Sequence, residues 1–171
     1  PWSPAAEFLG KEEAEKTFDS YFDYDLYRMA DVAANPKREA IWTPVYLDAG
    51  GAGLMVTHSS PVWVGDTFLG IVGTDVLLSH LSDYLARFPA TAGQVVLIDQ
   101  ADNVVAADRG LSPSATAPTR ASALLGAAPT APTGGHFRKA GGVLVSSVPI
   151  EGTPWRMVMP IPATAPAAAM A

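Results

Sequence analysis

Apolar residues near the N-terminus recur at steps of three and four, the spacing of one face of a helix. This stripe consists of Phe18, Phe22, Leu26, Met29 and Ala33. Rings and charges recur at the same spacing on a second face, which consists of Tyr21, Tyr24, Arg28 and Asp31. The pattern predicts a long helix over residues 5–34 with two packing neighbours. It ends before Pro36, because the residue preceding a proline avoids the helical region.

Three β-strands are predicted next, over residues 42–48, 54–64 and 67–77. The loop between the first two, AGGAG at 49–53, supplies glycines for the positive φ angles that a hairpin needs. The segment LLSHLSDYLARF then predicts a short amphipathic helix closed by Pro89. Its expected buried residues are Leu77, Leu81, Tyr84, Leu85 and Phe88.

The second half of the chain repeats this kind of pattern. Two apolar strands surround a turn at 99–103, TRASALLGAA predicts a short helix, and residues 136–162 supply three more strands around glycine turns. This order predicts a small antiparallel sheet with helical cover, so the expected fold class is α+β. Asp99 and Asp102 are expected to be turn residues.

These elements divide the chain into predicted parts. We expect the N-terminal helix and a first lobe over residues 1–90, and a second lobe over 91–162. The Pro/Ala-rich residues 163–171 are expected to form a linker that leads elsewhere in the protein.

Composition and charge narrow the choice of partners. The 171 residues are 49% hydrophobic, which is enough for a substantial core, and carry a net charge of -6, which argues against nucleic acid or an anionic lipid surface as partner. The chain has no Cys, which excludes thiol catalysis, a cysteine zinc site and disulfides. Because no apolar run is long enough to span a bilayer, we expect membrane attachment only through flanking segments.

One arginine and four short sequence motifs follow one another along the chain. They are Arg28, WTPVYLD at 42–48, SSPV at 59–62, GIVGTDV at 70–76 and VVLIDQADNVVAA at 95–107. This order resembles the double Cache (PDC, PAS-like) extracytoplasmic sensor domains of bacterial transmembrane receptors. The resemblance extends over about residues 21–161. It implies a long N-terminal helix with PAS-like antiparallel sheet lobes.

The resemblance also implies a function and a location. Such domains lie on the periplasmic side of the inner membrane and bind a small molecule in the membrane-distal lobe. They pass a shift in helix position to a histidine kinase, a diguanylate cyclase or a chemotaxis domain, so the sensor region itself is expected to have no enzymatic activity and no cofactor. This chain differs in carrying Ala30 and Asp31 where members that bind amino acids or amines have an aromatic pair. The two strands that open the distal lobe are also not recognisable before Trp42.

The first predicted strand holds candidate ligand-binding residues. Strand alternation places Trp42, Pro44, Tyr46 and Asp48 on one face. Rings, a hydroxyl and a carboxylate together suit a small-molecule pocket. The alternative is that the two rings belong to the core and that Asp48 opens the hairpin turn.

Arg28 and Asp75 are the candidate charged groups. Arg28 can bind a carboxylate through two parallel hydrogen bonds, or it is an ordinary surface arginine. Asp75 lies in an otherwise apolar strand and therefore needs a partner, which is a ligand ammonium, Arg28 or the N–H groups that begin the following helix. Facing one cavity, the two charges would suit an amino acid or a similar small polar metabolite. The predicted ligand-binding residues are Tyr24, Arg28, Trp42, Tyr46, Asp48, Ser60 and Asp75.

Other chemistry has little support in the sequence. The histidines are on separate elements without acidic residues at ligand spacing, so no metal site is predicted at His58, His80 or His136. No nucleophile elbow surrounds Ser59 or Ser60, so no hydrolase is predicted.

The alternative to sensing is an interaction module. In that interpretation the aromatic face of the N-terminal helix packs on a second copy of the chain and forms a homodimer. The residues of this face are Tyr21, Tyr24 and Tyr27.

Overall fold

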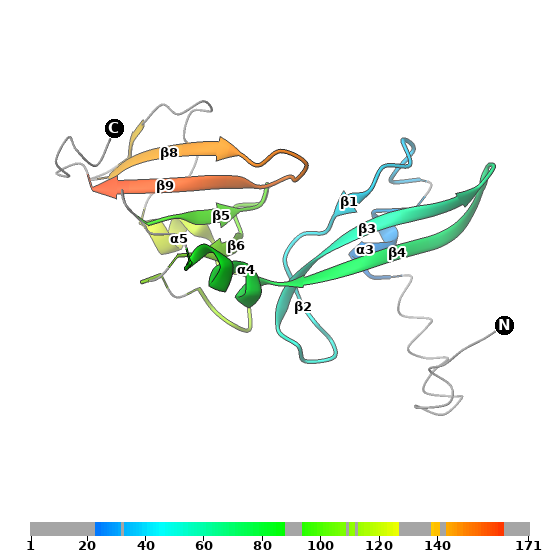
Figure 1. Cartoon of the computed structure of the whole chain (residues 1–171), viewed down its shortest axis with the longest axis horizontal. Helices are drawn as coiled ribbons and strands as arrows, with labels where there is room; N and C mark the ends of the chain where they lie inside the picture. The colour runs from blue at the N-terminus through cyan, green and yellow to red at the C-terminus, as the bar shows by residue number, and fades with distance from the viewer. Residues whose placement is uncertain are drawn as a thin grey trace. The chain divides into compact units, whose positions relative to one another are not determined.

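The computed structural model describes residues 23–31, 33–87, 94–108, 110–111, 113–126, 138–140 and 143–162. Two compact units make up the chain. Unit 1 is Pro1–Thr43 with Thr57–Thr74, and unit 2 is Pro44–Val56 with Asp75–Ala171. Two long strands, β3 (Leu54–Val64) and β4 (Thr67–Leu77), contribute to both units (Figure 1). The division expected near residues 88–93 lies outside the described residues.

Helix α3 (Asp25–Arg28) is the described part of the predicted N-terminal helix, most of which lies outside the described residues. The chain continues after Arg28 in successive turns, and not in the helix expected up to residue 34. Hydrogen bonds from Ala30 N–H to Tyr27 O and from Ala34 N–H to Asp31 O tighten these turns. The 3.6-residue period therefore stops, so that Ala30 is fully buried while Ala33 is exposed.

The strand predicted over 42–48 is interrupted and forms β1 (Ile41–Trp42) and β2 (Tyr46–Leu47). Both pair with β3 in antiparallel register, Trp42 opposite His58 and Tyr46 opposite Met55. The three residues 43–45 therefore lie opposite only two residues of β3, which is a β-bulge. Pro44 has no N–H to donate to the ladder.

The bulge is closed by a side chain. Thr43 N–H donates to Thr57 O at 2.9 Å, and Thr57 N–H donates to the Thr43 side-chain Oγ1 at 2.9 Å. Both threonines are buried, at 2% and 1% exposure. The hydroxyl thus occupies the place of a strand carbonyl, and this buried N–H is satisfied although the ladder is irregular.

The strands β3 and β4 have the bounds that the sequence predicts, and the glycine loop before β3 is also confirmed. Asp48 N–H donates to Gly53 O at 2.9 Å to close this loop. Gly51 and Gly53 have φ angles of 85° and 116°, which L side chains rarely adopt.

Among the described residues of unit 1, a buried hydroxyl and a group of aromatic side chains connect separate segments of the chain. Ser59, which is fully buried on β3, donates its hydroxyl to Leu26 O at 2.8 Å and so fastens α3 to the strand (Figure 1). At the hairpin end, the Arg38 guanidinium lies 4.1 Å from the centre of the Trp63 ring and pairs with Asp66 at 2.8 Å. The Phe68 ring lies 5.3 Å from Trp63.

Unit 2 contains a five-stranded antiparallel sheet in the order β6-β5-β9-β8-β7. Helix α4 (Leu78–Leu85) precedes the strands of this sheet in the chain. Helix α5 (Ala121–Leu125) comes between β6 and β7 in the chain. The predicted order of elements and the α+β class are confirmed. The strands are β5 (Val96–Ile98), β6 (Val104–Ala107), β7 (Arg138–Ala140), β8 (Val143–Pro149) and β9 (Arg156–Pro162).

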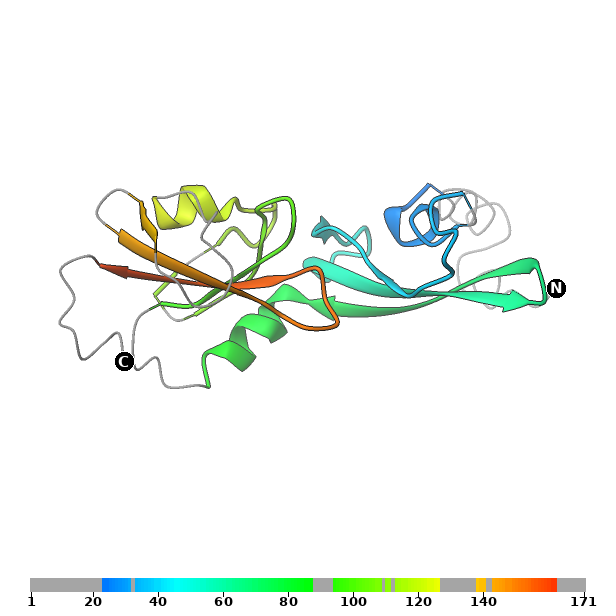
Figure 2. The ribbon, with the colours of Figure 1, turned by 90° about the horizontal axis from the view of Figure 1, so that it is seen from above.

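The helices α4 and α5 lie on opposite faces of this sheet (Figure 2). The face under α5 carries the hydrophobic core, in which Ala121 contacts strand residues that include Val96, Val104 and Val158. On α4, Tyr84 is 57% exposed, so its expected burial was wrong. Phe88 lies outside the described residues. No helix among the described residues is long and apolar enough to cross a membrane.

The turn between β5 and β6 confirms the structural role expected for Asp99. Its Oδ1 accepts hydrogen bonds from the backbone N–H groups of Ala101 and Asn103, both at 2.8 Å. Asp102 adopts a φ of 65° and accepts a hydrogen bond from the Ser122 hydroxyl at 2.7 Å, which ties the turn to α5.

Removing the Ser59 hydroxyl should loosen α3. We expect Ser59→Ala to lower the free energy of unfolding by about 1 kcal/mol, because the Leu26 carbonyl loses its partner. The adjacent Ser60→Ala, at a half-buried position, is the matched control and should change stability by less than about 0.5 kcal/mol. Urea unfolding measures both variants. Equal effects of the two substitutions would show that the Ser59 hydrogen bond does not hold the helix.

Candidate ligand-binding site

Four predicted ligand-binding residues belong to unit 1. Arg28 is the last residue of α3 and is exposed, while Tyr24 precedes the helix and is 37% exposed. The Tyr24 carbonyl accepts hydrogen bonds from the N–H groups of Tyr27 and Arg28, both at 3.0 Å. The short helix therefore presents a guanidinium to solvent, where it is accessible to an anionic group.

Trp42 and Ser60 are half-buried in unit 1. The Trp42 ring packs against the His58 side chain with 4.7 Å between ring centres. Ser60 follows Ser59, whose hydroxyl is already engaged with the α3 backbone. Of these two serines, the structural one is therefore Ser59.

Tyr46 and Asp48 belong to unit 2. Tyr46 is half-buried on β2, opposite Met55. The Asp48 side-chain Oδ2 accepts a hydrogen bond from Ala52 N–H at 2.9 Å across the glycine loop. Of the two interpretations of Asp48, the structure supports the turn-opening one.

The expectation that Trp42, Pro44, Tyr46 and Asp48 share one face was wrong. The extra residue at the bulge breaks the two-residue alternation between Trp42 and Tyr46. Thr43 and Val45 are buried, and Pro44 between them is exposed. The two rings are therefore not presented by one regular strand.

Asp75 lies in an exposed stretch of β4, next to the exposed Gly73 and Thr74. The argument that its carboxylate is desolvated in an apolar strand was therefore wrong, since solvent reaches it. The N-cap position of α4 is held by Leu77, not by Asp75. Asp75 is therefore a carboxylate on β4 that solvent reaches.

Metal binding receives no support from the described part of the chain, where no group of three His, Asp or Glu residues is placed to hold an ion. His136 lies outside the described residues. The histidine at position 58 packs on Trp42, as an aromatic side chain does in a sheet.

A pocket of about 270 Å³ lies within unit 2, and none of the seven predicted residues lines it. Its walls come from the residues just before and at the start of β3, from α4, from β6 and from the loop at 113–119. The sequence patterns did not indicate this site, since its parts are far apart in the chain. The two serines on α4, three residues apart beside the apolar stripe, were the available signal.

The fold is that of ligand-binding domains from bacterial chemoreceptors. It is similar to the Pseudomonas fluorescens CtaA domain in complex with L-leucine, with a TM-score of 0.62 and 16% identity over 88% of this chain and 62% of that one. The Pseudomonas aeruginosa PctC domain with GABA has a TM-score of 0.57 and 23% identity, over 82% of this chain and 60% of that one. The Campylobacter jejuni Tlp3 domain with 4-methylisoleucine has a TM-score of 0.58 and 21% identity, over 83% and 53%.

Part of the sequence also matches a family of chemoreceptor-type sensor domains. Residues 6–83, less than half of the chain, match the family described as methyl-accepting chemotaxis protein-like, first PDC sensor domain. The resemblance to PDC sensor domains is thus confirmed, whereas the presence of two Cache lobes stays a prediction. The chain spans between 53% and 62% of the three solved chains above. Among curated proteins, none matches this chain.

Substitution of Asp48 tests whether its side-chain oxygen or its negative charge stabilises the glycine loop. We expect Asp48→Ala to destabilise the chain by about 1–2 kcal/mol, because Ala52 N–H loses its acceptor. Asp48→Asn keeps a carbonyl oxygen and should cost less than half as much. Urea unfolding of both variants gives the comparison. A cost for Asn as large as that for Ala would contradict the turn role.

Proposed function

We propose that this chain is the small-molecule-sensing region of a bacterial transmembrane signalling protein and that it lies on the extracytoplasmic, periplasmic side of the inner membrane. The observation that carries the proposal is the match of residues 6–83, which include β1 to β4, to a chemotaxis-type sensor family. The similarity of the fold to chemoreceptor ligand-binding domains supports it. Of the predicted output domains, the family description favours a chemotaxis domain over a kinase or a cyclase.

The proposed ligand is a small polar metabolite such as an amino acid or an amine. Arg28 is assigned to a ligand carboxylate, which a guanidinium binds through parallel hydrogen bonds, and Asp75 to a ligand ammonium. Both residues are exposed, so a ligand can reach them from solvent. The solved relatives are in complex with L-leucine and with GABA, both of which carry these two charges.

The protein's task in this proposal is binding and not catalysis. A ligand changes the signal only through its difference in affinity between two conformations of the chain. Asp48 closes a loop, and Arg28 and Asp75 are assigned to the ligand's charges; the remaining members of the predicted site are Tyr24, Trp42, Tyr46 and Ser60. They are assigned to the ligand's uncharged parts.

The dimerisation alternative receives no specific support. Tyr27 is half-buried and packs edge-on against Phe68 in unit 1, with 5.7 Å between ring centres. Its ring is therefore engaged within one chain. Tyr24 is exposed, and Tyr21 lies outside the described residues.

Removing either charge should weaken ligand binding. We expect Arg28→Ala and Asp75→Ala each to raise the Kd for an amino acid or amine at least about tenfold, a loss of about 1.4 kcal/mol. A screen by thermal unfolding finds the ligand, because at 100 times the Kd it adds about 2.7 kcal/mol of stability to the parent chain.

Matched controls separate a site effect from a change in net charge. Arg87→Ala and Asp83→Ala each remove an exposed charge of the same sign and should leave the Kd unchanged. Without ligand, all four variants should melt within a few degrees of the parent, because exposed substitutions cost little. Equal ligand-induced shifts in the parent, Arg28→Ala and Asp75→Ala would contradict the assignment.

A further inference from the structure

We propose that the pocket in unit 2 is a second binding site, which takes a small uncharged molecule with an apolar body and one carbonyl or hydroxyl oxygen. This inference does not rest on the proposed amino-acid site, since no residue is common to the two. It rests on the shape, lining and volume of the pocket itself.

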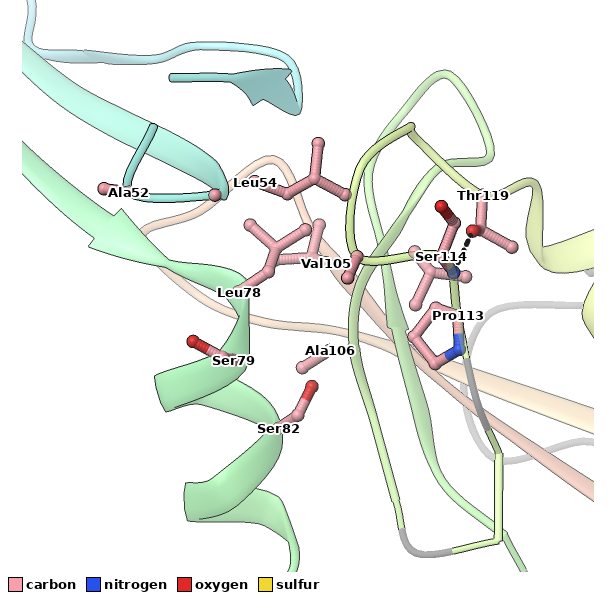
Figure 3. Close-up of a pocket in the computed structure, with 13 residues that line it drawn as sticks. Ala52, Leu54, Leu78, Ser79, Ser82, Val105, Ala106, Pro113, Ser114 and Thr119 are labelled. Carbon is pink, nitrogen blue, oxygen red and sulfur yellow. Dashed lines mark hydrogen bonds between the residues drawn. The ribbon is translucent and has the colours of Figure 1, made fainter. Parts of the chain in front are cut away.

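The apolar wall comes from three elements that are distant in the sequence. Figure 3 shows the side chains of Leu54 from β3, Leu78 from α4 and Val105 from β6 directed toward one another at one end of the pocket. The methyl groups of Ala52, Ala106 and Ala115 extend this surface. An apolar ligand body placed here would leave water and gain contact with these side chains.

Three hydroxyls of the pocket, those of Ser82, Ser114 and Thr119, already accept hydrogen bonds. The Ser82 Oγ accepts one from Ala107 N–H at 3.2 Å, and the Thr119 Oγ1 accepts one from Ser114 N–H at 2.8 Å (Figure 3). The Ser114 Oγ accepts from the N–H groups of Thr116 and Ala117, both at 3.2 Å. Because each hydroxyl still has its own hydrogen to donate, the pocket offers donors to a ligand oxygen.

The lining contains no Asp, Glu, Lys, Arg or His. A zwitterion in this pocket would lose hydration at both of its charges without gaining a counter-charge. The ligand class of this site is therefore different from that proposed for Arg28 and Asp75. An uncharged molecule does not have this penalty.

The volume sets the size of the ligand. The pocket measures about 270 Å³. Since a dry cavity of about 150 Å³ is large enough for benzene, this pocket accepts a molecule of roughly seven to twelve non-hydrogen atoms. Benzyl alcohol, cyclohexanone and acetanilide are uncharged probes in this range that carry an oxygen acceptor.

Titration of the whole chain with these three probes tests the proposal. We expect at least one probe to bind in the millimolar range and to shift the backbone amide NMR signals of Ser82, Ala106 and Thr119. Benzylammonium and benzoate, which match benzyl alcohol in size but are charged, should bind at least about tenfold more weakly, a difference of about 1.4 kcal/mol.

Two phenylalanine variants on one exposed loop locate the binding. Ala115 lines the pocket, whereas Ala117 is exposed on the same loop and does not. Ala115→Phe should fill the pocket and raise the probe Kd at least tenfold, while Ala117→Phe should change it less than twofold. Neither variant should alter the thermal shift produced by an amino acid, so failure of the two proposals can be told apart.

The outcomes that overturn the inference are specific. They are the absence of binding by all three uncharged probes, equal loss in the Ala115→Phe and Ala117→Phe variants, or charged analogues that bind as well as benzyl alcohol. Displacement of a bound probe by an amino acid in the Arg28→Ala and Asp75→Ala variants would also overturn it. Those variants lack the charged groups of the other site, so the zwitterion would then have to bind in the uncharged pocket.

Discussion

The hydrogen bond from Thr57 N–H to the Thr43 side-chain oxygen determines how the predicted ligand-binding strand is built. A backbone carbonyl in this place would continue the ladder, and a regular strand would run from Trp42 to Asp48. The hydroxyl instead satisfies the buried N–H while the chain accommodates one extra residue beside Pro44. Two short strands with different register result, and the rings on them are presented separately.

This constraint explains why the polar residues of the segment have different roles. Asp48 follows β2 directly, so its carboxylate reaches the N–H of Ala52 and closes the loop. Arg28 and Asp75 lie outside the interrupted strand, and both are exposed to solvent. An exposed charge is inexpensive to keep and still attracts an opposite charge, whereas an uncharged pocket selects by shape and hydrogen bonds. The chain thus combines exposed charges with a pocket whose lining is uncharged.

The sequence predicts those helices and strands that are determined by neighbouring residues in the chain. The bounds of β3 and β4 follow from apolar alternation between glycine turns, and the order of elements in unit 2 follows from the same signals. The bulge could not be predicted, because it depends on a contact between Thr43 and a strand fourteen residues away. The exposure of Asp75 also depends on neighbours that the strand pattern does not specify. The pocket could not be predicted either, because Leu54, Leu78 and Val105 come together only in the folded chain.

Helix α4 connects the two candidate recognition features of unit 2. The helix begins at Leu78, immediately after β4 ends at Leu77. Asp75 lies near the C-terminal end of that strand. The same helix provides Leu78 and Ser82 to the uncharged pocket. Because no loop separates strand from helix, the backbone runs from Asp75 directly into the helix that lines the pocket. Coupling between equilibrium binding sites is reciprocal, so the two sites are independent, as the Ala115→Phe and Ala117→Phe variants test, only if neither ligand favours one position of this helix over another.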